Sequence, residues 1–268
     1  MTLKEWVENA KAKVGGLDAE LIAMAALGFS DRVDVVLYSQ DEYDFSEADK
    51  MLEKRITGIP LAYIVGQKEF YGRNFYINSN VLIPRPETEQ MILSVLGIVD
   101  AEKMEHVSIL DVGTGSGCIS VTLKLELDAD GVEADVSGVD ISAPALEVAQ
   151  KNADSLGAKV KIFRSDLLES IESLPDIITA NLPYVDMDWD WTSPELRFEP
   201  ALALYAGDGG LKLIKKLIDE ITDRKTDNKR RFLLLEADIS QHDDIIRYAG
   251  EYNFEKISHN GYIIGFKY

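Results

Sequence analysis

Four consecutive residues, Asn181-Leu182-Pro183-Tyr184, could hold an NH2 group that is conjugated to a carbonyl or a ring. The lone pair of such a nitrogen is delocalised, so the nitrogen is a poor nucleophile. The Asn181 side-chain oxygen and the Leu182 backbone carbonyl could each accept one N–H, while the Tyr184 ring stacks on the plane. This arrangement would orient the nitrogen for in-line displacement without a metal or a covalent intermediate. The alternative is a plain turn, because Pro183 keeps the preceding residue extended.

A glycine loop lies upstream of this motif, in the stretch LDVGTGSGC. Gly113, Gly115 and Gly117 are spaced two apart, and glycine lets a ligand approach the backbone closely. The spacing differs from the G-x-G-x-x-G of dinucleotide-binding enzymes, so a nicotinamide oxidoreductase is the least favoured hypothesis. A glycine loop by itself can also be only a tight turn.

Acidic residues follow the next two β-rich runs. Asp140 ends the run GVD and can accept both hydroxyls of a ribose. Asp166 follows FRS and can accept from an adenine amino group. Either acid alone could merely cap a helix or a turn. A glycine loop at one strand end, followed by an acidic residue at each of the next two strand ends, favours an adenosine ligand. No Gly-Lys-Ser or Gly-Lys-Thr follows the loop, so a ligand without phosphates, S-adenosylmethionine, is expected.

The elements that must position these residues alternate between strand and helix patterns from Val107 onward. The β-rich runs are VSILDVG, VSGVDIS, VKIFRSD, DIITANLPY, RFLLLEAD and KISHNGYIIGFKY. This alternation predicts a mostly parallel sheet that is covered on both faces, and ligands bind such sheets beyond the carboxyl ends of the strands. The last two strands are close in sequence, so we expect them to pair antiparallel.

The segment before Val107 has a different pattern. The first sixty residues carry apolar side chains at three-to-four spacing, which predicts a small helical domain. Ser46 and Asp49 suit a capping box at the start of one of these helices. The stretch KEFYGRNFYINSN then predicts a β-hairpin, and Pro84 and Pro86 hold the following segment extended.

Composition narrows the class of protein. The chain has 268 residues and a net charge of −19, with 47 acidic against 28 basic residues, which disfavours a nucleic-acid-binding face. One cysteine, Cys118, excludes an internal disulfide, and three scattered histidines give no zinc spacing, so no metal is expected. The start, MTLKEWVENAKAK, lacks the apolar core of a signal peptide, so we expect a cytoplasmic protein.

Several blocks of the chain resemble the bacterial release factor glutamine methyltransferases. The most specific is PLAYIVGQKEFYGRNFYINSNVLIPRPETE, residues 60–89. ILDVGTGSGCIS, DISAPALEVAQKNA, RSDLL and EPALALYAGDGGLKLIKKLI are also similar. The resemblance covers most of the chain. It implies a Rossmann-like class I methyltransferase fold, with a seven-stranded mostly parallel sheet, a small N-terminal helical domain and a β-hairpin hinge. The implied domains are a helical substrate-recognition domain over 1–62, the hinge over 63–84 and the methyltransferase domain over 85–268.

The resemblance also implies an activity: methyl transfer from S-adenosylmethionine to the glutamine of the Gly-Gly-Gln motif in class-1 peptide chain release factors. The partner would be that protein substrate, with no direct contact to nucleic acid or membrane, and we expect a monomer. When the family's roles are carried over residue by residue, the residues that would bind the glutamine amide are Asn181, Leu182, Pro183 and Tyr184. The residues implied at the cofactor are Gly113, Thr114, Gly115, Ser116 and Gly117 for the methionine part, Asp140 for the ribose, Asp166 and Leu167 for the adenine, and Arg85, Pro86, Thr88 and Asn181 beside it.

The chain departs from the family pattern at two places. The family has proline where this chain has Leu182, and a glycine where the run Glu236-Ala237-Asp238 has Asp238. Leucine keeps the carbonyl that the chemistry needs but lacks the fixed φ of proline. Losing that restraint costs about 0.4–1 kcal/mol, which is less than a tenfold effect on rate. We therefore expect an active enzyme.

Two other hypotheses stay open. A methyltransferase for the NH2 group of adenine or guanine in nucleic acid can use a similar tetrapeptide, and it would have to bind phosphates. A catalytically silent module that binds the cofactor and docks a partner is the second, and Leu182 is its support. Trp189 and Trp191, just after the motif, receive no role.

Overall fold

The computed structural model describes residues 1–189 and 193–268, so Trp191 lies outside the described residues. These residues form two compact units. One unit consists of Met1–Gln67 together with residues 193–198, and the other of residues 68–189 together with Glu199–Tyr268.

The first unit is helical and has its own core. Its helices are α1 (Leu3–Val14), α2 (Gly16–Leu27), α3 (Arg32–Leu37), α4 (Ser46–Ile56) and α5 (Leu61–Val65), and η2 (Leu196–Phe198) also belongs to it. Trp6 stacks on Phe45 in this core, with 5.3 Å between ring centroids. The expected capping box at Ser46 is wrong, because Asp49 accepts instead from the Trp6 indole N–H at 2.8 Å. Asp44 caps the Ser46 amide in its place, at 3.0 Å.

A short hairpin follows, with strands β1 (Gln67–Phe70) and β2 (Arg73–Tyr76). The two residues between the strands, Tyr71 and Gly72, both have positive φ, 51° and 72°. That is the pattern of a type I′ turn, whose twist matches the right-handed twist of paired strands. The hairpin predicted from KEFYGRNFYINSN is therefore confirmed.

The second unit is built on a seven-stranded sheet of order β5-β4-β3-β6-β7-β9-β8. Its strands are β3 (His106–Val112), β4 (Glu133–Asp140), β5 (Lys161–Arg164), β6 (Ile177–Ala180), β7 (Phe232–Glu236), β8 (Glu255–Asn260) and β9 (Ile263–Lys267). The first five strands in that order are parallel, and β9 pairs antiparallel with both β7 and β8. The predicted fold class, including the antiparallel last pair, is confirmed. The carboxyl ends of five strands consequently meet at one edge of the sheet.

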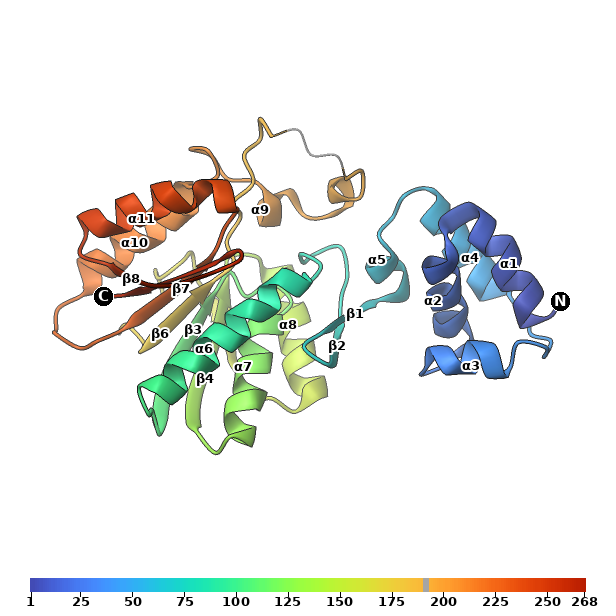
Figure 1. Ribbon diagram of the computed structural model, residues 1–268, viewed down its shortest axis with the longest axis horizontal. Helices are drawn as coiled ribbons and strands as arrows, with labels where there is room; N and C mark the ends of the chain where they lie inside the picture. The colour runs from blue at the N-terminus through green and yellow to red at the C-terminus, as the bar shows by residue number, and fades with distance from the viewer. Residues whose placement is uncertain (190–192) are drawn as a thin grey trace. The chain divides into compact units, whose positions relative to one another are not determined.

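Helices cover both faces of this sheet (Figure 1). One layer contains α6 (Glu89–Ala101), α7 (Cys118–Ala129) and α8 (Ala143–Leu156), and the other contains α10 (Lys212–Arg224) and α11 (His242–Glu251). Shorter elements are η1 (Pro86–Thr88), α9 (Ala201–Leu204) and η3 (Ile239–Gln241). None of the helices within the described ranges is long and apolar enough to cross a membrane.

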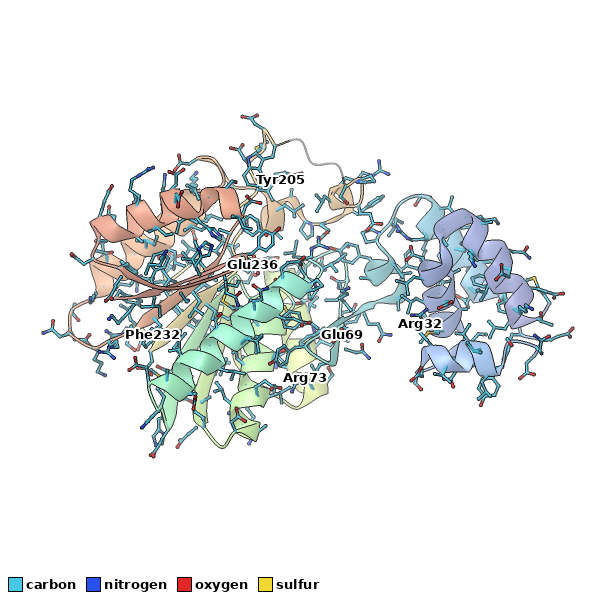
Figure 2. All side chains as sticks on the ribbon, in the orientation of Figure 1. Arg32, Glu69, Arg73, Tyr205, Phe232 and Glu236 are labelled. Carbon is cyan, nitrogen blue, oxygen red and sulfur yellow. The ribbon has the colours of Figure 1, made fainter. Side chains whose placement is uncertain are left out.

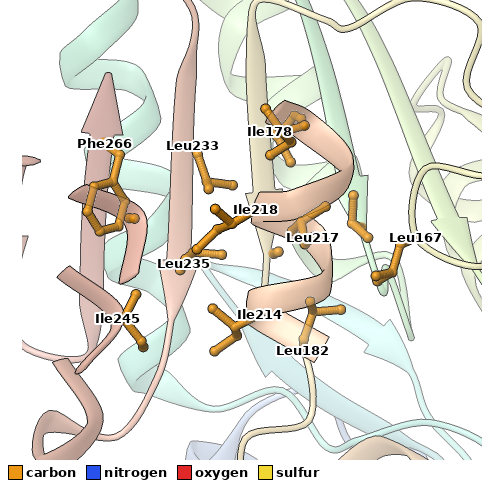
Figure 3. Close-up of a cluster of buried hydrophobic side chains, with 14 of the residues drawn as sticks. Leu167, Ile178, Leu182, Ile214, Leu217, Ile218, Leu233, Leu235, Ile245 and Phe266 are labelled. Atoms are coloured by element: carbon orange, nitrogen blue, oxygen red, sulfur yellow. The ribbon is translucent and has the colours of Figure 1, made fainter. Parts of the chain in front are cut away.

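Alternate residues of each strand serve the two faces, as the strand period of two requires. Leu233 and Leu235 of β7 point into the cluster under α10 and α11, where Leu217 of α10 meets them (Figure 3). The neighbouring positions along β7 are also buried, which is typical of a parallel strand covered on both sides.

One buried carboxylate links two of the strands to the glycine loop. Asp111 of β3 lies in register with Thr179 of β6 and accepts from its hydroxyl at 2.9 Å. Its other oxygen accepts from the hydroxyl of Thr114, in the loop, at 2.6 Å. The side chain is completely buried, and that burial raises the pKa of Asp111 to about 6 even though both hydroxyls favour the charged form.

This raised pKa predicts a stability that falls as the pH rises. The folded state binds a proton at Asp111 more tightly than the unfolded chain does. The stability from that proton is therefore complete below the ordinary value of 3.8 and is lost as the pH rises through about 6. We compare the free energy of unfolding of Asp111→Asn with that of wild type, measured in urea. The difference, variant minus wild type, should be roughly 1–3 kcal/mol higher at about pH 8 than at about pH 4.

Asp135→Asn is the matched control, since Asp135 is exposed on the neighbouring strand β4. It should show a much smaller difference between the two pH values. An equal pH dependence in both variants would contradict the assignment to Asp111.

Candidate active site

A cavity of about 360 Å³ opens at the carboxyl ends of the parallel strands. This volume lies in the range of sites for small ligands, roughly 300–1,000 Å³. Segments from the glycine loop, the ends of β4, β5 and β6, residues 80–88 and the start of α10 line it. Of the residues predicted from the sequence, those that line the cavity are Arg85, Thr88, Gly113, Thr114, Gly115, Ser116, Asp140, Asp166, Leu167, Asn181, Leu182 and Pro183. Pro86, Gly117 and Tyr184 do not line it.

The glycine loop is shaped by its neighbours. Gly113 has φ 73°, and a Cβ there would lie 3.1 Å from Cδ2 of Leu182. A side chain at this position would therefore strain the backbone and press on the loop that follows β6. Gly117 also has a positive φ, 78°, and has a second reason to be glycine. It is the N-cap residue before helix α7, and a Cβ there would lie 3.2 Å from the Ala149 Cβ, so glycine allows close packing of this turn on α8.

Asp140, the last residue of β4, has both carboxylate oxygens held by backbone N–H groups. Gly115 donates to Oδ2 at 3.0 Å and Ser142 donates to Oδ1 at 2.9 Å. Burial raises the pKa of Asp140 above its ordinary value, and these backbone donors oppose the rise. The carboxylate is thereby fixed in orientation, and each oxygen keeps lone pairs for a ligand.

Asp166 lies two residues beyond the end of β5. Its Oδ1 accepts from Nζ of Lys216 at 3.0 Å. Lys216 comes from α10 and also lines the cavity. Sequence reasoning missed this lysine, because KLIKKLI shows only that one face of the helix is polar and not what that face meets.

Asn181 follows β6 directly, and its Nδ2 donates to the Thr88 hydroxyl at 3.3 Å. Leu182 lines the cavity and supplies the backbone carbonyl of the motif. The residue is only 4% exposed, and its side chain packs in the core near Ile214 (Figure 3). Tyr184 turns away from the cavity, and its phenol donates to Oε1 of Glu236 at 3.5 Å. The four motif residues thus divide between the cavity and the interior.

A buried glutamine holds the main chain of this motif. Nε2 of Gln241 donates to the carbonyl of Tyr184 and to that of Gly209, both at 2.8 Å. The chain passes so close at Gly210 that a Cβ there would lie 2.0 Å from the Tyr184 carbonyl oxygen. Only glycine fits at this position, which explains the second glycine of the pair in YAGDGG.

Two more positioning residues were missed from the sequence. The buried Glu199 accepts from the Ile83 amide at 3.0 Å and pairs with Arg85, and so holds the 80–88 segment against the cavity. The buried Asn152 of α8 accepts from the Tyr76 amide at 2.7 Å and donates to the Ser116 carbonyl at 2.8 Å. A polar residue in a helix or loop pattern is normally read as exposed, so neither role had a signal in the sequence.

Within residues 1–189 and 193–268, no three His, Cys, Asp or Glu side chains gather in a way that could hold a metal ion. The cysteine that lines the cavity, Cys118, is buried, and burial raises the pKa of its thiol to about 12.

Two family models match the chain. The Methyltransferase small domain matches residues 91–193, and the PrmC N-terminal domain matches residues 7–66. Among solved structures, a 16S rRNA methyltransferase from T. thermophilus, in complex with AdoMet and guanosine, has a TM-score of 0.51 and 15% identity. That similarity covers 75% of this chain and 48% of the other, and it supports the fold alone.

Curated relatives extend the match over nearly the whole chain. The release factor glutamine methyltransferase of Neisseria gonorrhoeae is 38% identical over 248 residues, which is 90% of this chain and 86% of that protein. The protein of the same name from Koribacter versatilis is 39% identical over 82% of this chain and 81% of its own length. At this identity and coverage, the chain belongs to the release factor glutamine methyltransferase family.

Proposed function

We propose that this protein transfers the methyl group of S-adenosylmethionine to the side-chain amide nitrogen of the glutamine in the Gly-Gly-Gln motif of class-1 peptide chain release factors. The observation that carries the proposal is the position of Asn181 and Leu182. They place an amide side chain and a carbonyl-bearing turn in the same cavity as the glycine loop and two strand-end acids. Membership of the family supports the choice of substrate.

The residues around the cavity fit the cofactor. Adenosine needs acceptors for the ribose hydroxyls, and the Asp140 carboxylate is held in place with lone pairs to spare. Leu167 and Ile141 supply apolar surface on that side, and Asp166 can accept from the adenine amino group. The methionine part would lie along the backbone at Gly113 and Gly115, where no Cβ blocks the approach.

When bound, the cofactor supplies a methyl group on a positively charged sulfur. The chain's own residues hold and orient the acceptor. Oδ1 of Asn181 and the carbonyl of Leu182 accept the two N–H bonds of the glutamine amide, which directs the nitrogen lone pair at the methyl group. Stacking of the Tyr184 ring on that amide stays a prediction, since the ring does not line the cavity and its phenol points to Glu236.

The remaining assignments follow from the same proposal. The unit that contains Met1–Gln67 would recognise the release factor, with support from the match to the PrmC N-terminal domain. We infer that the protein acts as a monomer in the cytoplasm, where translation provides its substrate.

Methyl transfer to a release factor tests the function directly. The purified chain, incubated with a class-1 release factor and S-adenosylmethionine, should add one methyl group to the Gly-Gly-Gln glutamine, detected by peptide mass spectrometry. Asn181→Ala should lower kcat by roughly 10²-fold, since it removes one of the two groups that orient the nitrogen. Asn228→Ala, in an exposed loop, is the control and should be unchanged. Methylation of nucleic acid with none on the release factor would contradict the proposal.

Leu182→Pro separates the two contributions of that position. Proline keeps the carbonyl, so we expect kcat within about tenfold of wild type. It loses most of a buried isobutyl group, so the free energy of unfolding should fall by roughly 1–3 kcal/mol in urea. Leu182→Ala should lower it further, by about 2–5 kcal/mol. An inactive wild type beside an active Leu182→Pro would instead identify a damaged site.

A further inference from the structure

A carboxyl group is buried behind the wall of the cavity. Glu236 is the last residue of β7, and it is 2% exposed (labelled in Figure 2). Its Oε2 is completely buried and has no hydrogen-bond partner in the part of the chain that the structure describes. Burying an incompletely paired carboxyl group costs free energy, so such groups are concentrated at functional sites.

The polar neighbours of Glu236 are the residues of the proposed acceptor site. The Tyr184 phenol donates to Oε1 at 3.5 Å. Burial raises the pKa of Glu236 to about 7, and Thr88 and Asn181 lie near enough to this carboxyl group to oppose the rise. Both of these residues line the cavity, whereas Glu236 does not. Glu236 can therefore act on a ligand only through them.

The order of donors and acceptors fixes which way the Asn181 amide faces. An ionised carboxylate can only accept, so it would draw the proton of the nearby Thr88 hydroxyl. The Thr88 oxygen is then left to accept from Nδ2 of Asn181, the bond seen at 3.3 Å. With Nδ2 engaged, Oδ1 is the end of the amide that is available to an incoming NH2 group.

A neutral side chain at 236 removes this constraint. A protonated Glu236, or a glutamine, can itself donate to Thr88, and the Thr88 hydroxyl can then donate to Asn181. The Asn181 amide would turn its oxygen toward Thr88 and present Nδ2 to the substrate. Two NH2 groups facing each other cannot hydrogen-bond, so the acceptor would be poorly held.

We propose that Glu236 is a positioning residue for the methyl acceptor, which as a carboxylate acts through Thr88 to keep the oxygen of Asn181 directed at the substrate amide. This inference rests on the proposed function, because it assigns a cause to the orientation of Asn181. It accounts for the incompletely paired carboxyl group at the end of β7 and for the contact of Asn181 with Thr88, a residue 93 positions away.

Other titratable groups also face this carboxyl. Glu87 raises its pKa by like-charge repulsion, and the Tyr184 phenol lowers it through a hydrogen bond. Cys118 of α7 is near enough for Glu236 to raise the pKa of its thiol. Arg85, Asp238 and Tyr262 act on the same phenol of Tyr184. Glu87 is exposed and outside the hydrogen-bonded group, so it offers a way to shift the titration without breaking the contacts.

The test is the pH dependence of methyl transfer to a class-1 release factor, measured as kcat and kcat/KM from about pH 5.5 to about pH 9. Wild type should lose activity as the pH falls through about 7, where Glu236 becomes protonated. Glu236→Gln should lower kcat by roughly tenfold to a hundredfold at high pH. The pH profile of this variant should not show the fall in activity near pH 7 that wild type shows. The affinity of this variant for S-adenosylhomocysteine, measured by calorimetry, should differ from that of wild type by less than about twofold.

Glu87→Gln is the matched control, with the same chemical change one residue from Thr88. It should have the wild-type kcat at high pH. Its activity should fall at a lower pH than that of wild type, because the substitution removes a like charge that raises the pKa of Glu236. A Glu236→Gln enzyme that has the wild-type kcat and loses activity at the same acidic pH as wild type would overturn the inference. So would a variant that loses its affinity for S-adenosylhomocysteine in parallel with its activity. A wild type that methylates no release factor at any pH would overturn the proposed function itself.

Discussion

The parallel pairing of β4, β3 and β6 is the constraint on which the site depends. Because the strands run the same way and in register, their carboxyl ends meet at one edge, and the residues that follow each strand are brought together there. The glycine loop, Asp140 and Asn181 are far apart in the sequence but become neighbours around one cavity. The buried Asp111, bonded to Thr179 across the β3–β6 pair, adds a directional link to this register.

Loops at a sheet edge have no strand ladder to hold them, and in this protein buried polar side chains take over that role. Asn152 joins the hairpin to the glycine loop, Glu199 holds the 80–88 segment, and Gln241 holds the carbonyl of Tyr184. Each makes two or more hydrogen bonds from a buried position, where a missing partner costs roughly 1–3 kcal/mol. Such pairs define loop conformation more sharply than apolar contacts do, because hydrogen bonds depend on direction.

Leu182 shows how one position can serve both chemistry and packing. Its backbone carbonyl belongs to the motif, and its side chain fills space between α10 and the glycine loop. Judged from the sequence, leucine only loses the restraint that proline provides. In the folded protein it also adds buried apolar surface, so the comparison between the two residues includes stability as well as the shape of the turn.

The sequence by itself determined the order of strands and helices, the hairpin, and the strand ends that carry glycines, acids and Asn181. Those features are local, since hydrophobic periodicity and turn residues act over a few positions. Only the tertiary structure decided that Asp49 bonds to Trp6 instead of capping its own helix, and that Tyr184 faces Glu236. The same holds for the partners of Lys216, Glu199 and Asn152. The physical reason is that a polar side chain gains as much from water as from a distant partner, so its type and spacing do not reveal which of the two it will meet.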